Sequence, residues 1–204
     1  VLNMACGGGK NAFNLKRHFE VTGIDISQPM LDLAKKLNPE CTFVQADMRT
    51  CSLGRQFDCV FVDDVVSGMA QSDLAAVFRT AFEHLRSGGV MVVSPGGDVT
   101  KETFEQNGTR ITHARSSLKP ESIDVVFIEN NYDPDPTDDT YEFTLVYLIR
   151  EDGKLRVEID RETEAFVSLD VWRATIREAG FEIHDGSFTE DQKTSLLLAC
   201  VKPL

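Results

Sequence analysis

Short apolar runs alternate with helical patterns through the first half of the chain, and this alternation limits the fold more than any other feature. The apolar runs are typical of buried strands and cover residues 1–4, 21–25, 41–45, 57–62 and 90–93. The segments between them carry apolar residues at helical spacing. Strands joined by helices are parallel, and their crossovers are right-handed. The sequence therefore predicts an α/β fold, with a Rossmann-like, doubly wound sheet over residues 1–99.

The helix predicted after the second strand has a clear start and an apolar stripe. Ser27 can cap its first turn, where Pro29 is tolerated. Four apolar residues follow at helical spacing: Met30, Leu33, Ala34 and Leu37. This pattern predicts that the four side chains face the core.

The pattern of the sequence changes near residue 100. Apolar residues then alternate with other residues, as in strands, at 123–127, 141–149 and 155–159. Asp152-Gly153 separates the last two runs and is a typical hairpin turn. We therefore expect an inserted antiparallel sheet within residues 100–166. Residues 167–204 return to a helical pattern and predict the last helix and two closing strands of the core.

The charge of the chain limits its partners. The 204 residues include 21 Lys and Arg against 33 Asp and Glu, which gives a net charge of −12. This balance argues against nucleic acid, whose binding needs clustered basic residues, and it suits a cationic ligand. Many of the acids lie within residues 120–149, where the chain has no Lys or Arg.

The cysteines and the hydropathy indicate a compartment. There are five cysteines and no C-x-x-C motif. This fits reduced thiols in the cytoplasm better than disulfides or a zinc site. No apolar run reaches the roughly 18 residues of a membrane span, and no signal peptide is visible. The chain begins inside an apolar run without an initiator Met, so we expect that an N-terminal segment is missing.

A glycine-rich turn follows the first predicted strand. Such a turn lets a ligand approach the backbone, and the next helix adds the positive end of its dipole. The spacing Gly7-x-Gly9-x-x-Ala12 fits the dinucleotide-binding pattern G-x-G-x-x-G/A. Asp25 ends the second strand, where a carboxylate can accept hydrogen bonds from both ribose hydroxyls. These residues are therefore compatible with a nicotinamide-dependent oxidoreductase.

A third element narrows this choice. Asp47 and Met48 follow the third predicted strand, where a carboxylate can accept from an adenine amino group and a methionine can cover the ring. With these residues the sequence resembles the class I S-adenosylmethionine-dependent methyltransferases. The resemblance covers nearly all of residues 1–95, and it rests on the segments 1–9, 23–27 with Met30, 46–49, 57–64 and 85–89. It also implies a last strand that runs antiparallel.

The resemblance implies a binding site for S-adenosylmethionine. The glycine loop would lie under the methionine portion, Asp25 would hold the ribose, and Val62 with Asp63 would line the floor near the methyl group. Asn3 stands where the family usually has an acid, and it brings no charge. The implied cofactor-binding residues are Asn3, Ala5, Cys6, Gly7, Gly9, Asp25, Ile26, Met30, Asp47, Met48, Val62 and Asp63.

Methyl transfer from a sulfonium mainly requires that the acceptor be positioned and that water be excluded. An amine acceptor also needs a group that takes its proton. We select Asp64, at the end of the fourth strand, and Tyr132, in the acidic segment, as candidate catalytic residues. We expect no metal site.

The inserted sheet resembles, in its architecture, a small sheet of some small-molecule N-methyltransferases. There it roofs the acceptor site and often mediates dimers, which implies a small-molecule acceptor and a homodimer through the sheet. Its acidic residues would favour a neutral or amine-bearing acceptor. Two alternatives stay open: a nicotinamide-dependent oxidoreductase, from the glycine spacing, and a non-catalytic cofactor-binding module on the same fold, from Asn3.

Overall fold

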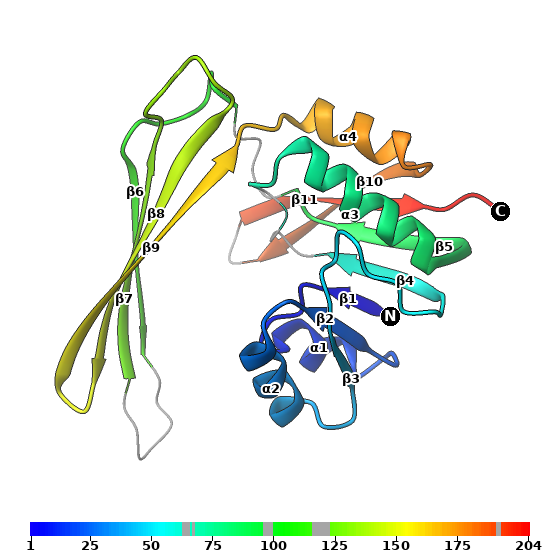
Figure 1. Cartoon of the computed structure of the whole chain (residues 1–204), viewed down its shortest axis with the longest axis horizontal. Helices are drawn as coiled ribbons and strands as arrows, with labels where there is room; N and C mark the ends of the chain where they lie inside the picture. Colours follow the sequence, from blue (N-terminus) through cyan, green and yellow to red (C-terminus); the bar gives the residue numbers. More distant parts are fainter. Residues whose placement is uncertain (63–65, 67, 96–99, 116–122, 191–192) are drawn as a thin grey trace. The chain divides into compact units, whose positions relative to one another are not determined.

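The chain divides into two compact units in a computed structural model, which describes all residues except 63–65, 67, 96–99, 116–122 and 191–192 (Figure 1). The first unit consists of Val1–Asp98 and Val167–Leu204, and the second consists of Val99–Phe166. Each unit contains its own sheet.

The first unit is built on a seven-stranded sheet with the order β10-β11-β5-β4-β1-β2-β3. Its strands are β1 (Leu2–Met4), β2 (Thr22–Asp25), β3 (Thr42–Gln45), β4 (Phe57–Val62), β5 (Leu85–Val93), β10 (Glu182–Glu190) and β11 (Lys193–Val201). The first five are parallel, and β11 runs antiparallel to β5. The α/β fold and the antiparallel last strand are thus confirmed.

The strand order contains a switch point between β1 and β4. The chain moves outward from β1 through β2 to β3, and then returns to the other side of β1 with β4. At such a switch point the loops after neighbouring strands diverge, so ligands bind beyond the carboxyl ends of the strands. A ligand site is therefore expected beyond the carboxyl ends of β1 and of the strands near it.

Four helices are described in the first unit: α1 (Lys10–Leu15), α2 (Gln28–Leu37), α3 (Gln71–His84) and α4 (Leu169–Glu178). Figure 1 shows α3 and α4 side by side, and Phe78 of α3 packs against Trp172 of α4 with 5.5 Å between ring centroids. These rings belong to the main core, which also contains Leu2 and Met4 of β1. A smaller cluster lies under α1 and α2.

The apolar stripe predicted for α2 was wrong in three of its four residues. Met30, Leu33 and Leu37 are exposed, whereas Leu31 and Ala34 are fully buried. Asn38, just after the helix, continues the buried stripe, because its side-chain amide donates to the carbonyl oxygens of Gly9 and Ala34. Because the prediction used apolar residues alone, it missed Asn38 and selected the neighbouring stripe that contains Met30, Leu33 and Leu37. The predicted Ser27 cap is confirmed by its bond from Met30 N–H.

The second unit is a four-stranded antiparallel sheet in the order β6-β7-β8-β9. Its strands are β6 (Gly108–Arg115), β7 (Ile123–Tyr132), β8 (Thr140–Glu151) and β9 (Lys154–Ala165). Asp152 and Gly153 both have positive φ, 48° and 78°. This is the backbone that a tight β8–β9 hairpin requires. The inserted antiparallel sheet is confirmed. Phe104, Tyr141 and Phe166 pack together at one end of it.

Candidate functional site

Asp25 fixes the glycine loop at the carboxyl end of β2. One of its carboxylate oxygens accepts from Gly7 N–H at 2.8 Å, and the other accepts from Ser27 N–H at 2.9 Å. The carboxylate therefore joins the loop after β1 to the start of α2. Each carboxylate oxygen can accept more than one hydrogen bond, so Asp25 keeps acceptor capacity for a ligand.

The glycine loop follows a path that few side chains permit. Gly9 has φ 83°, and a Cβ there would lie 2.6 Å from Asn38 Nδ2 and 3.0 Å from Ala34 Cβ. Gly7 has φ 50°, and a Cβ there would have Met30 Cε as its nearest neighbour, at 3.5 Å. Met30 thus lies against the loop from α2, which explains why this side chain is outside the core.

A cavity of about 390 Å³ opens beside this loop. Its volume lies in the size range of small-molecule sites. It is found at the carboxyl ends of β1, β2 and β3, where the switch point predicts a site. The structure brings together five of the predicted cofactor residues in its lining: Ala5, Asp25, Ile26, Asp47 and Met48. Ala46, Arg49 and Met69 also line it and were not predicted.

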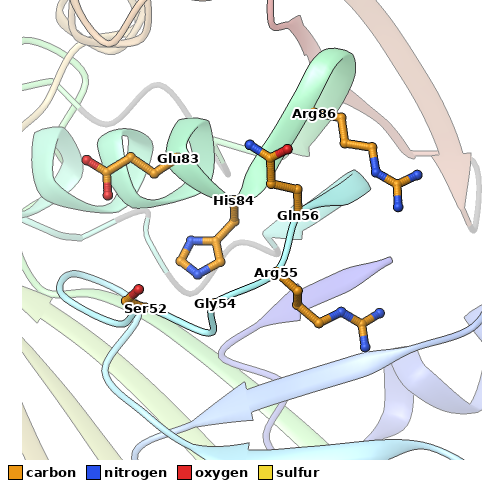
Figure 2. A pocket seen from close by; sticks show the side chains of 7 residues that line it. All are labelled: Ser52, Gly54, Arg55, Gln56, Glu83, His84 and Arg86. Carbon is orange, nitrogen blue, oxygen red and sulfur yellow. The ribbon is translucent and has the colours of Figure 1, made fainter.

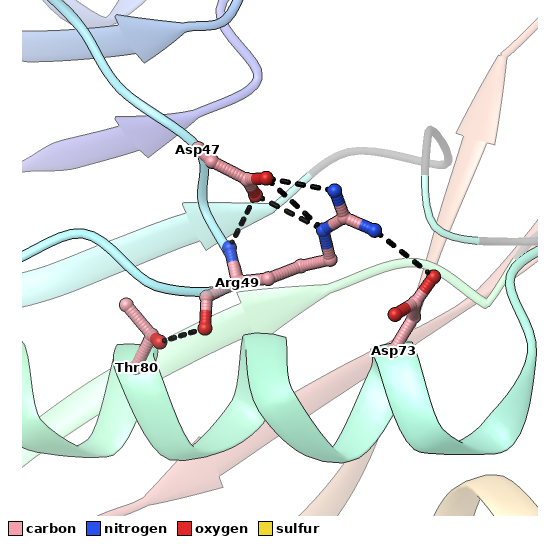
Figure 3. Close-up of polar contacts among 4 residues, drawn as sticks. All are labelled: Asp47, Arg49, Asp73 and Thr80. Carbon is pink, nitrogen blue, oxygen red and sulfur yellow. Dashed lines mark hydrogen bonds and ion pairs between the residues drawn. The ribbon is translucent and has the colours of Figure 1, made fainter.

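Arg49 is the most engaged of the residues that were not predicted (Figure 3). Its guanidinium donates to both carboxylate oxygens of Asp47, with Nη2–Oδ2 at 2.7 Å, and to Asp73 of α3 at 3.2 Å. Hydrogen bonds from Arg49 hold the pKa of the Asp47 carboxyl below its ordinary value. The sequence signal was its place in the segment 46–49, two positions after Asp47, and its pairing with Asp73 could not be seen because Asp73 is distant in the sequence.

Two predicted residues are buried: Asn3 of β1 and Cys6 at the start of the glycine loop. Asn3 is fully buried, and neither atom of its side-chain amide has a hydrogen-bond partner among the described residues. Burial, together with the charge of Asp25, raises the pKa of the Cys6 thiol to about 12. Cys6 is therefore a protonated packing residue at neutral pH and is unsuited to act as a nucleophile.

The remaining predicted residues are distributed differently. Val62 is fully buried in the main core and does not line the described cavity. Asp63 and Asp64 lie outside the described residues. Tyr132 ends β7 in the second unit, with its side chain exposed.

A second cavity, of about 650 Å³, lies at the other ends of the strands, where β4 begins and α3 ends (Figure 2). Ser52, Gly54, Arg55, Gln56, Glu83, His84 and Arg86 line it. Both arginines pair with exposed carboxylates, Arg55 with Glu20 and Arg86 with Asp58. Both ring nitrogens of His84 are also engaged, at Leu53 N–H and the Thr80 carbonyl. The described residues that line this cavity thus leave no free buried polar group for a ligand.

The part of the chain that forms the first cavity is similar in sequence to known proteins. The sequence model of a family described as "Methyltransferase domain" matches residues 1–89. The resemblance of the sequence to the class I S-adenosylmethionine-dependent methyltransferases is thereby confirmed. Among the described residues, no helix is long and apolar enough to cross a membrane.

Two curated relatives come from Streptomyces. A dTDP-3-amino-3,4,6-trideoxy-alpha-D-glucopyranose N,N-dimethyltransferase of Streptomyces venezuelae is 30% identical over 130 residues, 58% of this chain and 55% of the relative. A dTDP-3-amino-3,6-dideoxy-alpha-D-glucopyranose N,N-dimethyltransferase of Streptomyces fradiae is 33% identical over 131 residues, 58% and 51%. The chain thus spans about half the length of these relatives.

Solved structures share the whole fold. DesVI of Streptomyces venezuelae has a TM-score of 0.82 at 24% identity, covering 98% of this chain and 82% of its own. The sugar N-methyltransferase KedS8 from Streptoalloteichus has a TM-score of 0.80 at 23% identity, covering 100% and 79%. The predicted fold class, a Rossmann-like core with an inserted sheet, is confirmed by these similarities.

Proposed function

We propose that the chain is an S-adenosylmethionine-dependent methyltransferase whose acceptor is a small molecule with an amino group on a sugar. The observation that carries this proposal is the cavity at the switch point, which unites Ala5, Asp25, Ile26, Asp47 and Met48. The match of residues 1–89 to a methyltransferase domain supports the reaction class. The names of the two Streptomyces relatives support an amino sugar as the acceptor.

The residues of the cavity fit this cofactor. Asp25 has oxygens with spare acceptor capacity for ribose hydroxyls, and Asp47 offers a carboxylate to the amino group of adenine. Ile26 and Met48 supply apolar cover for the ring. Asn3 of β1, whose amide has no partner among the described residues, suits the polar amino-acid end. We assign Cys6, Gly7, Gly9, Met30, Val62 and Asp63 to the same site as loop and floor residues.

When bound, S-adenosylmethionine supplies an electrophilic methyl group on a sulfonium. The task of the chain is then to hold the acceptor nitrogen in line and to exclude water, and orientation of this kind lowers a barrier by roughly 7–11 kcal/mol. The acceptor amine must be unprotonated to attack. We propose Asp64 and Tyr132 as the acceptor-side residues that take its proton or orient it.

Calorimetry and a methyl-transfer assay test the proposal together. We expect the chain to bind S-adenosylhomocysteine and to methylate a dTDP-3-amino sugar but not its 3-hydroxy counterpart. Asp25→Asn should weaken cofactor binding about tenfold, the effect of losing a charged hydrogen-bond partner. Asp58→Asn, which removes an exposed carboxylate beside the other cavity, is the matched control and should bind normally.

The alternatives give different results in the same experiments. Fluorescence enhancement of NADH on binding, with no binding of S-adenosylhomocysteine, would favour an oxidoreductase. Binding of S-adenosylhomocysteine without methyl transfer to any amino acceptor would favour a non-catalytic module.

We also propose that the second unit joins two copies of the chain. The β-sheet register places Ile159, Val146, Ile128 and Ile111 in one row across it. The edge members Ile159 and Ile111 are 59% and 66% exposed, and Val157, two residues before Ile159 on β9, is 52% exposed. Contiguous apolar surface of this kind is typical of protein interfaces. Val157→Lys should convert a dimer into a monomer in light scattering, whereas Glu158→Lys on the opposite face should not.

The state of the cysteine thiols bears on the compartment in which the chain works. All five cysteines are free, and the described structure contains no disulfide. Free thiols persist in a reducing compartment, so we propose the cytoplasm.

A further inference from the structure

Arg49 occupies a central place in the wall of the cofactor cavity. Its backbone N–H donates to Asp47 Oδ1 at 2.8 Å, and its Nη2 donates to Oδ2 at 2.7 Å. Its single Nε–H is shared between Oδ1 and Oδ2, at 3.1 and 3.2 Å. A carboxylate has about four acceptor positions, and these bonds occupy most of them. The Asp47 carboxylate therefore keeps about one acceptor position for a ligand, and the bonds from Arg49 fix its direction.

The same arginine is tied to α3 at two points (Figure 3). Its Nη1 donates to Asp73, and its carbonyl oxygen accepts from the buried Thr80 hydroxyl at 2.9 Å. Asp73 and Thr80 are two helical turns apart, so they lie on one face of α3. The helix α3 thus anchors the arginine that bonds Asp47. Neither Asp73 nor Thr80 lines the cavity.

Stability does not explain this arrangement. The side chains of Asp47, Arg49 and Asp73 are 33%, 43% and 42% exposed. Ion pairs this open to solvent contribute little to the free energy of folding. The Thr80 bond uses the carbonyl oxygen of Arg49 and not the guanidinium, so we expect the loop to keep its path when only the side chain is changed. The main effect of the Asp47–Arg49 pair is therefore to orient the carboxylate and not to stabilise the fold.

We propose that Arg49 is a positioning residue that makes the cavity select adenine. It holds the Asp47 carboxylate so that its remaining lone pair meets the exocyclic amino group of the base. Hypoxanthine has a carbonyl at that position, which cannot donate and is repelled by a carboxylate. This inference rests on the proposed function, because it takes an adenosine cofactor as the occupant.

The test compares two probes, S-adenosyl-L-homocysteine and its deaminated analogue S-inosyl-L-homocysteine, by calorimetry on the full chain. We expect the unchanged protein to prefer the adenine compound by about tenfold to a hundredfold, as for a lost charge-assisted hydrogen bond. Arg49→Gln should reduce this ratio to within about threefold, mainly by weakening the adenine compound. Arg49→Lys should restore part of it, because lysine brings the charge without the planar fork.

Two further variants separate positioning from a structural role. Asp73→Asn, outside the cavity lining, should lower the ratio by about two- to threefold while the melting temperature stays within about 2 °C. Arg55→Gln, which removes an exposed arginine at the second cavity, should change neither.

The outcomes are distinct. An unchanged ratio in Arg49→Gln, or equal weakening of both probes with a large fall in melting temperature, overturns the inference and leaves the proposed function standing. Failure of the unchanged protein to bind either probe overturns both.

Discussion

Asn3 is the single residue whose environment is hardest to explain by folding alone. It lies between Gly23 and Phe61 in the sheet register, fully buried, with no hydrogen-bond partner for its amide among the described residues. A buried polar group left in this state costs about 1–3 kcal/mol. The chain keeps the residue despite that cost, which fits a role in binding.

We therefore predict opposite effects of Asn3→Leu on stability and on binding. Leucine is close in shape and needs no hydrogen bond, so urea unfolding should give an increase of about 1 kcal/mol in unfolding free energy. Calorimetry should give weaker binding of S-adenosylhomocysteine, by about tenfold. A variant that unfolds more easily and binds as well as the unchanged protein would show that Asn3 is only structural.

Gly9 gives a second prediction at the scale of the residue. In Gly9→Ala the new methyl group would clash with Asn38 and Ala34. The left-handed backbone adds a penalty of about 1–2 kcal/mol, so we expect a total loss of about 3 kcal/mol. Gly54→Ala is the matched control, because Gly54 has φ 64° and a Cβ there would meet no atom within 4 Å. Urea unfolding of both variants separates the two effects, and equal losses would contradict the clash.

At the scale of elements, local pattern predicts the parallel strands and the inserted sheet. The family resemblance, not the pattern, predicts the five residues that line the first cavity together. Prediction from the sequence fails where contacts join distant segments. The buried stripe of α2 continues in Asn38, which reaches the glycine loop, and Arg49 joins Asp47 to Asp73 of α3. Neither Asn38 nor Arg49 is distinguished by hydropathy, so no periodicity could identify them.

The pairing of β8 with β9 gives a pH prediction. Tyr141 opposes Glu164 and donates its hydroxyl to that carboxylate. Burial raises the pKa of Glu164 above its ordinary value of 4.5, so the folded chain holds this proton more tightly than the unfolded chain. The stabilisation from Glu164 is complete below about pH 4.5 and is lost as the pH rises through the raised pKa.

Glu164→Gln should abolish this loss, because the amide cannot ionise yet still accepts from Tyr141. We expect its melting temperature to exceed that of the unchanged protein by about 2–5 °C near pH 8 and to match it near pH 4. Glu178→Gln, at the exposed end of α4, serves as the control and should give no such difference between the two pH values.

At the scale of the whole molecule, some of the acidic residues behind the net charge of −12 also form turns. Asp133, Asp135 and Asp138 each accept a backbone N–H from the residue two positions later. Such turns rigidify the β7–β8 connection, and an asparagine can make the same bond. The charge and the turn can therefore be separated by experiment.

We predict that Asp133→Asn with Asp135→Asn raises the KM for an amino-sugar acceptor by about threefold to tenfold, because an attractive charge is lost while the turn persists. The dissociation constant of S-adenosylhomocysteine should not change. Steady-state kinetics at low and high salt measure this, since added salt should shrink the difference. An unaltered KM at low salt would show that these two charges do not act on the acceptor.

The pairing of β5 with β11 has a consequence for how the chain folds. Ser94 and Leu196 meet through a hydrogen bond although they are 102 residues apart along the chain. Closing so long a loop is entropically slow, whereas the hairpins of the second unit form between neighbours. We expect the inserted sheet to become ordered early and to shorten the effective loop, so that the closing strand adds last.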